Sequence, residues 1–241
     1  MSYWLVHAVF GMLLIIPWQS VRGIRLLDTL VVRDPGARLS FYRSAIVSQW
    51  ALAVIALAAM WSAEPRYVAE LFSSRLTSDA LLVLGFATLA LLSQSPLIPV
   101  VRDRMERSGA MRRMLYPMRN ILPRSAAEKN LWVTVSMTAG ICEEILFRAF
   151  LFFYAQSIIG LEAAGAVALS TAIFAVGHVY QGTANMFRVA IIGTILGVVF
   201  AATDNLVYCM ALHAFVDLGA LRMDTFVPGD DTIESTDIGD A

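Results

Sequence analysis

The sequence predicts an all-α membrane protein, a polytopic bundle of about seven transmembrane helices with a polar site inside the last four. Hydrophobic residues make up 58% of the 241 residues and charged residues only 15%, whereas soluble domains carry about 25% charged residues. A soluble chain of this length has no interior large enough for so much apolar surface, so part of that surface must contact lipid. No strand-like alternation or internal repeat is visible, which leaves helices as the spanning elements.

Seven apolar runs are candidates for helices that cross about 30 Å of hydrocarbon. The first run contains no Lys, Arg, Asp or Glu and has Trp4 and Trp18 near its ends as interfacial anchors. The third run carries Pro96 and Pro99 near its end. Very short connections between the last four runs predict antiparallel neighbours. The expected spans are residues 3–20, 44–63, 80–101, 131–158, 161–184, 186–203 and 205–221.

Arginine and lysine predict the orientation of the bundle. Residues 102–129 hold seven Arg and one Lys, whereas 64–79 hold two Arg and three acidic residues. Lys and Arg favour the cytoplasmic side, so we expect the N-terminus outside and the C-terminus in the cytoplasm, in a cell membrane such as the bacterial inner membrane. The expected connection between the first two spans holds Arg22, Arg25, Arg33, Arg38 and Arg43.

We expect one integral-membrane domain, residues 1–221, followed by an acidic, disordered cytoplasmic tail, residues 222–241. The lipid bilayer is an expected partner, whereas a net charge of −1 gives no indication of nucleic acid. Cys142 and Cys209 both lie in apolar stretches, which predicts buried free thiols and not a disulfide framework.

Ionisable residues inside the expected spans are concentrated in the second half of the chain. Each charge in a bilayer costs at least about 2.5–3.5 kcal/mol on insertion scales, so each needs a physical reason. We expect these side chains to face one another around a hydrated cavity, except Arg188, which lies near a span end and can extend to the interface. The residues are Glu143, Glu144, Arg148, His178, Arg188, His213 and Asp217.

Spacing separates the two adjacent glutamates. Glu144 and Arg148 are four residues apart and share a helix face, so an ion pair can offset the cost of burying both. Glu143 points about 100° away. Without that cation as a partner, it is the carboxylate able to accept a proton. His213 and Asp217 are also four apart, so the carboxylate can orient the imidazole or stabilise its charge.

Two interpretations of this set compete. The first is that the charges join helices through ion pairs and hydrogen bonds, and for Glu144 with Arg148 we prefer this structural role. The second is a functional site, which we prefer for Glu143, His178 and His213, because two histidines and a carboxylate on three helices exceed what joining helices requires. Asp217 fits either role.

Three motifs carry a resemblance to a known family. They are Glu-Glu-x-x-x-Arg at 143–148, Phe-x-x-x-His at 174–178 and His-x-x-x-Asp at 213–217, in this order and on separate expected helices. They resemble the motifs of the CAAX-processing-and-bacteriocin-processing (Abi) family, which includes the type II CAAX prenyl proteases. The resemblance covers about residues 120–222. The chain departs from the usual pattern at Ala149, where glycine is common, and at Asp217, where eukaryotic members have asparagine.

The resemblance implies an intramembrane endopeptidase. Glu143 would be the general base that takes a proton from water, and His178 would position that water. His213 and Asp217 would stabilise the oxyanion or orient the polar network. Phe174 supports the second motif, and the substrate would be a membrane-associated peptide or protein.

Two questions stay open at this point. We expect no cofactor, but if the enzyme needs zinc, the ligands would be Glu143, His178 and His213. The alternative function is a non-proteolytic membrane scaffold, immunity factor or small transporter that uses the same polar cluster as an ion or ligand site. The complete set of three motifs favours the enzyme.

Overall fold

The computed structural model describes residues 3–73, 77–107 and 110–223, and all regular structure in these ranges is helical. The predicted all-α class is confirmed. The acidic tail expected at 222–241 lies outside the described residues from position 224 onward.

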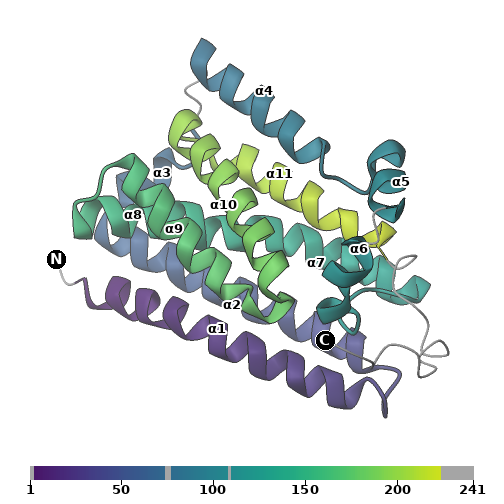
Figure 1. Ribbon diagram of the computed structural model, residues 1–241. Helices are drawn as coiled ribbons and strands as arrows, with labels where there is room; N and C mark the ends of the chain where they lie inside the picture. Colours follow the sequence, from purple (N-terminus) through teal and green to yellow (C-terminus); the bar gives the residue numbers. More distant parts are fainter. Residues whose placement is uncertain (1–2, 74–76, 108–109, 224–241) are drawn as a thin grey trace.

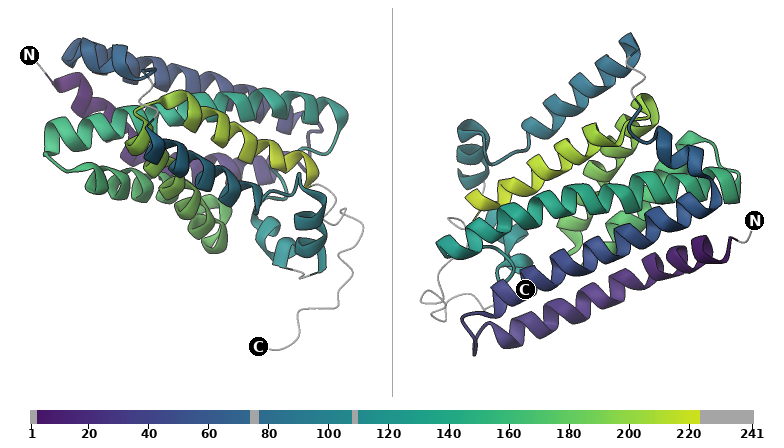
Figure 2. Two further views of the ribbon diagram at one scale, coloured as in Figure 1. Left: turned by 90° about the horizontal axis from the view of Figure 1, so that it is seen from above. Right: turned by 180° about the vertical axis from the view of Figure 1, so that it is seen from behind.

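Four helices form a row, and a second layer of helices lies on one face of it. The row consists of α1 (Trp4–Leu30), α2 (Ala37–Ala63), α7 (Ala126–Glu144) and α11 (Leu206–Leu218), each against the next. Figure 2 (right) shows this row from behind. On the opposite face, α9 (Ala163–Gly177) and α10 (Thr183–Thr203) pack together, and α4 (Ser78–Leu92) lies along α10 (Figure 1).

Shorter elements connect these helices. They are α3 (Pro65–Glu70), α5 (Pro99–Arg107), α6 (Ala110–Leu115), the 3-10 turns η1 (Tyr116–Met118), η4 (Val179–Gln181) and η5 (Gly219–Arg222), and the continuation of α7 through η2 (Ile145–Phe150), α8 (Leu151–Phe153) and η3 (Tyr154–Ile159).

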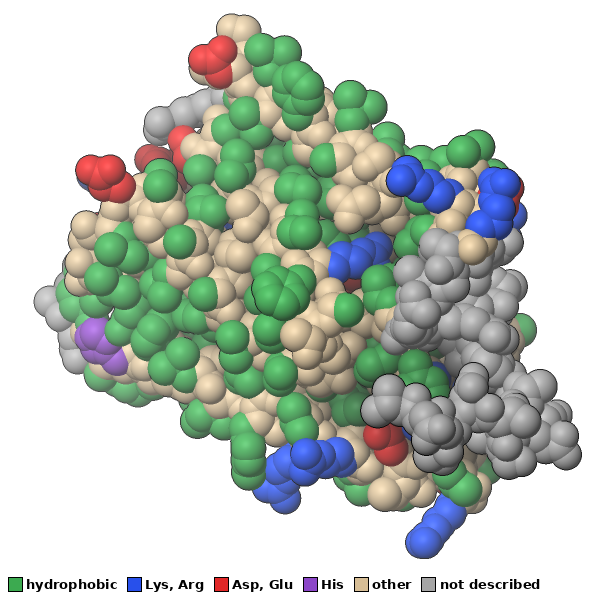
Figure 3. All heavy atoms as spheres, viewed as in Figure 1, with side chains coloured by type: hydrophobic (Ala, Val, Ile, Leu, Met, Phe, Trp, Pro, Cys, Tyr) green, Lys and Arg blue, Asp and Glu red, His purple; other side chains and the backbone are tan. Residues whose placement is uncertain are grey.

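Among the described residues, three helices are long and apolar enough to cross a membrane: α1, α2 and α10. The helices α4 and α9 are apolar but shorter. Large hydrophobic side chains such as Trp50, Phe86 and Phe187 are exposed, and hydrophobic groups cover much of the face in Figure 3. The chain is an integral membrane protein, while its seven spans stay a prediction.

The predicted connection between the first two spans is wrong. Arg22 and Arg25 lie within α1, and Arg38 and Arg43 lie within α2, so only Arg33 of the five falls in the turn between them. A helix of 27 residues is about 40 Å long at 1.5 Å per residue, which exceeds the hydrocarbon thickness. Four of the five basic residues therefore lie in the parts of α1 and α2 that adjoin the turn between them.

The expected third and fifth spans are also shorter than predicted. The run 80–101 is interrupted after Leu92, and a new helix begins at Pro99, because proline cannot donate the backbone hydrogen bond that a helix interior needs. The helix expected as the fifth span, α9, ends at Gly177 and does not reach residue 184. A 3-10 turn follows, and Gly182 adopts a φ of 85° there.

The helical segment that carries the first motif is long and uninterrupted. It begins with a capping box between Ser125 and Glu128 and ends at Gly160, which has a left-handed φ of 82°. Two stretches within it, η2 and η3, are π-helical. Such wider turns are frequent at functional sites.

Glycine allows two close helix contacts. A Cβ on Gly140 would lie 2.8 Å from Ala214 Cβ and 2.9 Å from the Met210 carbonyl oxygen, so α7 and α11 approach closely only because this residue is glycine. Gly193 and Gly197 face Phe174 and Val167 of α9. These two glycines therefore serve packing within the chain.

Candidate active site

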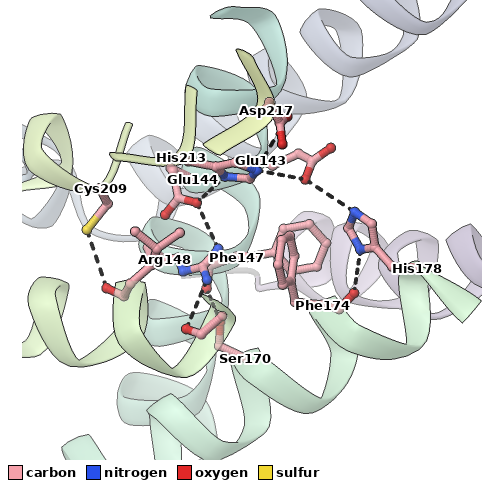
Figure 4. A network of polar contacts seen from close by, with 12 residues as sticks. Glu143, Glu144, Phe147, Arg148, Ser170, Phe174, His178, Cys209, His213 and Asp217 are labelled. Atoms are coloured by element: carbon pink, nitrogen blue, oxygen red, sulfur yellow. Dashed lines mark hydrogen bonds and ion pairs between the residues drawn. The ribbon is translucent and has the colours of Figure 1, made fainter. Parts of the chain in front are cut away.

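Four helical elements bring the motif residues together, as Figure 4 shows. Glu143 and Glu144 end α7, and Arg148 lies in the π-helical segment η2 that follows. His178 is the C-cap residue of α9. His213 and Asp217 lie one turn apart on α11, of which Asp217 is in the last turn.

The inner cluster consists of Glu144, Arg148 and His213. One carboxylate oxygen, Glu144 Oε1, lies 2.8 Å from Arg148 Nη1 and 2.6 Å from His213 Nδ1. The Glu144 and Arg148 side chains are 0% exposed and that of His213 is 5% exposed. The expected ion pair is therefore present, and it also holds the imidazole of the third motif.

Two further groups contact the Arg148 guanidinium. Its Nη2 atom donates to the Gly193 carbonyl oxygen over 3.0 Å, and its guanidinium lies over the Phe174 ring at 4.7 Å from the centroid. A Cβ on Gly193 would lie 3.0 Å from the Phe174 ring and 3.6 Å from Arg148 Nη2. The glycine on α10 thus leaves room for both side chains.

Phe174 is in contact with both histidines. Its ring centroid lies 4.6 Å from that of His178 and 5.8 Å from that of His213. Its backbone carbonyl oxygen lies 2.8 Å from His178 Nδ1. The second motif therefore places His178 through a backbone acceptor and a ring contact, both from the residue one turn earlier.

The outer cluster consists of Glu143, His178 and Asp217, and it faces the Nε2 atom of His213. Glu143 Oε2 lies 3.9 Å from His178 Nε2 and 3.8 Å from His213 Nε2, which in turn lies 3.8 Å from Asp217 Oδ2. The three side chains are 15%, 16% and 33% exposed respectively. Glu143 Oε2 is buried and has no hydrogen-bond partner among the described residues.

The hydrogen-bond partners assign the protons on both imidazole rings. Nδ1 of His178 faces a carbonyl oxygen and Nδ1 of His213 faces a carboxylate. Both partners are acceptors, so each Nδ1 carries hydrogen and donates. The two Nε2 atoms are then left to exchange a proton or to accept a hydrogen bond, and both point towards Glu143 Oε2. Contacts of 3.8–3.9 Å are too long for direct hydrogen bonds and suit a bridging water.

One further contact was not predicted. Gln49 Nε2, on α2, donates to Glu143 Oε1 over 2.9 Å. The sequence signal was an amide side chain in the middle of an apolar helix, where it needs a polar partner. Motif spacing could not name that partner because the two residues are 94 positions apart.

Asp217 is not the carboxylate nearest to the His213 ring. Glu144 holds Nδ1 at 2.6 Å, while Asp217 Oδ2 lies 3.8 Å from Nε2. Spacing along one helix favoured Asp217 as the residue that orients the ring, but the tighter contact comes from α7. Asp217 instead adds negative charge on the exposed side of the imidazole.

The geometry also bears on zinc. Among the residues that the structure describes, no group of three or more His, Cys, Asp and Glu side chains is placed so that it could hold a metal ion. As arranged, Glu143, His178 and His213 do not fit a zinc site. Cys142 and Cys209 are buried free thiols, as predicted, and Cys209 Sγ donates to the Leu196 carbonyl oxygen.

Comparison with known proteins supports the resemblance found in the motifs. Residues 127–219 match the family model described as type II CAAX prenyl endopeptidase Rce1-like. The predicted resemblance to the CAAX-processing-and-bacteriocin-processing family is thereby confirmed over this segment, which contains the whole inner and outer clusters. No curated protein and no solved structure matches the chain.

Proposed function

We propose that this chain, with its CAAX endopeptidase-like segment, is an intramembrane endopeptidase that hydrolyses a peptide bond with water activated by Glu143. The observation that carries the proposal is the Glu143 Oε2 atom. It is buried without a hydrogen-bond partner among the described residues and is faced by two imidazole Nε2 atoms at 3.8 and 3.9 Å. A water placed among these three atoms would be held by His178 and in contact with its base.

The proposed reaction balances with these groups alone. Glu143 takes a proton from the water as the water oxygen forms a bond to the carbonyl carbon of the substrate. The developing oxyanion accepts a hydrogen bond from His213 Nε2–H when that ring is protonated, because its Nδ1 is already committed to Glu144. The carbon–nitrogen bond then breaks, and the proton held by Glu143 passes to the leaving nitrogen.

Glu144 and Arg148 take no part in the bond changes. The ion pair cancels charge in a fully buried position and fixes the ring of His213. Asp217, one turn after His213, would favour the protonated ring that the oxyanion requires. Glu144 and Arg148 are therefore positioning residues in this proposal, whereas His213 touches the reacting atoms.

The proposed substrate is a membrane-associated peptide or protein. The matched family is named for CAAX prenyl endopeptidases, so a prenylated CAAX peptide is the first probe. We also propose that the Arg-rich helix ends face the cytoplasm. The reaction as proposed needs no metal, so prolonged chelation should leave the rate unchanged, whereas restoration of lost activity by stoichiometric zinc would overturn this part.

The test uses the full chain in lipid nanodiscs with a fluorogenic prenylated CAAX peptide and single-span membrane-anchored reporters. Cleavage by the wild type should be lost in Glu143→Gln and His178→Ala. The matched controls are Glu162→Gln and His7→Ala, because both residues are exposed and lie outside the two clusters. The proposal fails if the wild type cleaves none of these probes or if Glu143→Gln cleaves at the wild-type rate.

A further inference from the structure

Gln49 lies outside the segment that matches the endopeptidase family, yet its amide contacts the candidate base. It belongs to α2, which packs along α7. Its Nε2 atom donates to Glu143 Oε1 over 2.9 Å in a partly buried position. The N-terminal half of the chain thus supplies a hydrogen bond to the proposed catalytic group.

The two oxygens of Glu143 have different surroundings because of this contact. Oε1 accepts from Gln49, while Oε2 faces the Nε2 atoms of His178 and His213. Rotation about the last side-chain bond of a glutamate is only weakly restricted. The amide on α2 therefore fixes the plane of the carboxylate, and with it the lone pairs that face the two rings.

The amide is suited to this task because it is neutral. The charged or titratable groups around Glu143 come from elements other than α2. They include Glu144, Arg148, His178, Tyr180, His213 and Asp217. A cation on α2 would bind the carboxylate and compete with the proton that the base must accept. A second carboxylate would repel it. An amide donor fixes the orientation and leaves the charge balance to the other helices.

A role in joining two helices does not explain the surroundings of both polar atoms of the Gln49 side chain. Its Oε1 atom is buried and has no hydrogen-bond partner among the described residues. Leaving such an atom unsatisfied costs about 1–3 kcal/mol. The reversed amide would place this oxygen against Glu143 Oε1, so the observed orientation follows from the need to donate to the carboxylate.

We propose that Gln49 is a positioning residue for catalysis, which orients the Glu143 carboxylate so that Oε2 faces the water held between His178 and His213. The proposal rests on the proposed function of Glu143. Gln49 touches neither substrate nor water and acts only through the carboxylate. At metal sites, loss of a hydrogen bond that supports a functional side chain typically lowers metal affinity or activity about 10-fold to 100-fold, and we expect an effect of the same order here.

The test uses three variants of the full chain in nanodiscs. Gln49→Met keeps the volume and removes the donor, and Gln49→Glu replaces the donor by a second carboxylate. Ser48→Ala is the control, since Ser48 is exposed and its hydroxyl donates to the Ala45 carbonyl oxygen of the same helix. With the prenylated CAAX peptide, Gln49→Met should lower kcat about 10-fold to 100-fold and change KM less than about twofold. Gln49→Glu should move the acidic limb of the pH–activity profile to higher pH, because two adjacent carboxylates cannot both ionise easily.

An infrared measurement tests the same contact without a substrate. The carboxylate bands of Glu143 are isolated as the difference between the wild type and Glu143→Gln. These bands should shift in Gln49→Met and stay in place in Ser48→Ala, because only the first change removes a hydrogen bond from the carboxylate.

The outcomes separate this inference from the proposed function. Loss of cleavage in Glu143→Gln with a wild-type kcat in Gln49→Met would overturn the role of Gln49 alone. Cleavage retained in Glu143→Gln would overturn the proposed function. Unshifted infrared bands in both Gln49→Met and Gln49→Glu would refute the contact itself, including the case in which no probe is cleaved.

Discussion

The inner and outer clusters are built from the same kinds of side chain, yet they differ in how closely their polar groups approach one another and in how deeply they are buried. In the inner cluster, Glu144 Oε1 accepts from both Arg148 and His213 at 2.6–2.8 Å, and the exposed fractions are 0–5%. In the outer cluster, the facing atoms are 3.8–3.9 Å apart and the exposed fractions rise to 15–33%. Under the proposed function, the two adjacent glutamates thus have different tasks: Glu144 holds His213 in place, and Glu143 is the group that reacts.

The difference follows from the position of each carboxylate on α7. Glu144 shares a face with Arg148 one turn later and lies against α11, where Gly140 lets His213 approach. Glu143 faces α2 and the end of α9, where it lies beside the neutral amide of Gln49 and the imidazole of His178. Buried ion pairs add little net stability when compared with apolar packing. The inner cluster is therefore better explained by the orientation of His213 than by stabilisation.

The largest effect on stability is expected from breaking the inner cluster. Arg148→Met leaves Glu144 buried without its cation, which should lower the free energy of unfolding by about 3–5 kcal/mol. Arg33→Met, in the exposed turn between α1 and α2, is the matched control and should change it little. Thermal or denaturant unfolding in detergent measures both. Equal stability of the two variants would show that the inner cluster is not held by this pair.

A smaller loss of stability with a clear loss of activity is expected from Gly140→Ala. The added Cβ would lie 2.8–2.9 Å from Ala214 and from the Met210 carbonyl oxygen. α11 must therefore shift, and His213 moves with it. Overpacking of this kind costs about 1–3 kcal/mol. Gly85→Ala on α4 has nothing within 4 Å of its new Cβ, so it should retain both stability and cleavage. Wild-type activity in Gly140→Ala would mean that the distance between α7 and α11 does not matter.

The smallest effect is expected from Asp217→Asn. Because Glu144 already holds the His213 ring, the loss of charge at 3.8 Å should reduce kcat by less than about 10-fold while the fold is retained. Asp79→Asn, in the first turn of α4, serves as the control. Complete loss of cleavage in Asp217→Asn would show that Asp217, and not Glu144, has the main role in orienting His213.

Local spacing predicted the parts of the site that lie within single helices. The pair Glu144–Arg148 and the shared face of His213 and Asp217 both follow from a separation of four residues, and both are present. The three motifs together also indicated the family whose model residues 127–219 match. These features need only helical geometry and the cost of charge in lipid.

Contacts between distant segments could not be predicted in this way. The His213–Glu144 hydrogen bond joins positions 69 apart, and Gln49–Glu143 joins positions 94 apart, so each depends on how whole helices pack. Helix ends were missed for another reason. Hydropathy marks where an apolar stretch ends, but α1 continues through Arg22 and Arg25 because a helix does not stop at the membrane surface.

The central claim is that Glu143 reacts and Glu144 positions, and replacing each by glutamine in the same assay tests it most directly. Glu143→Gln should lower kcat by at least about 10²–10⁴-fold, the usual contribution of a general base, and leave the unfolding midpoint in detergent unchanged. Glu144→Gln should lower the unfolding midpoint, because Arg148 loses its counter-charge in a fully buried position. Unimpaired cleavage by Glu143→Gln, or equal destabilisation by the two changes, would contradict the account.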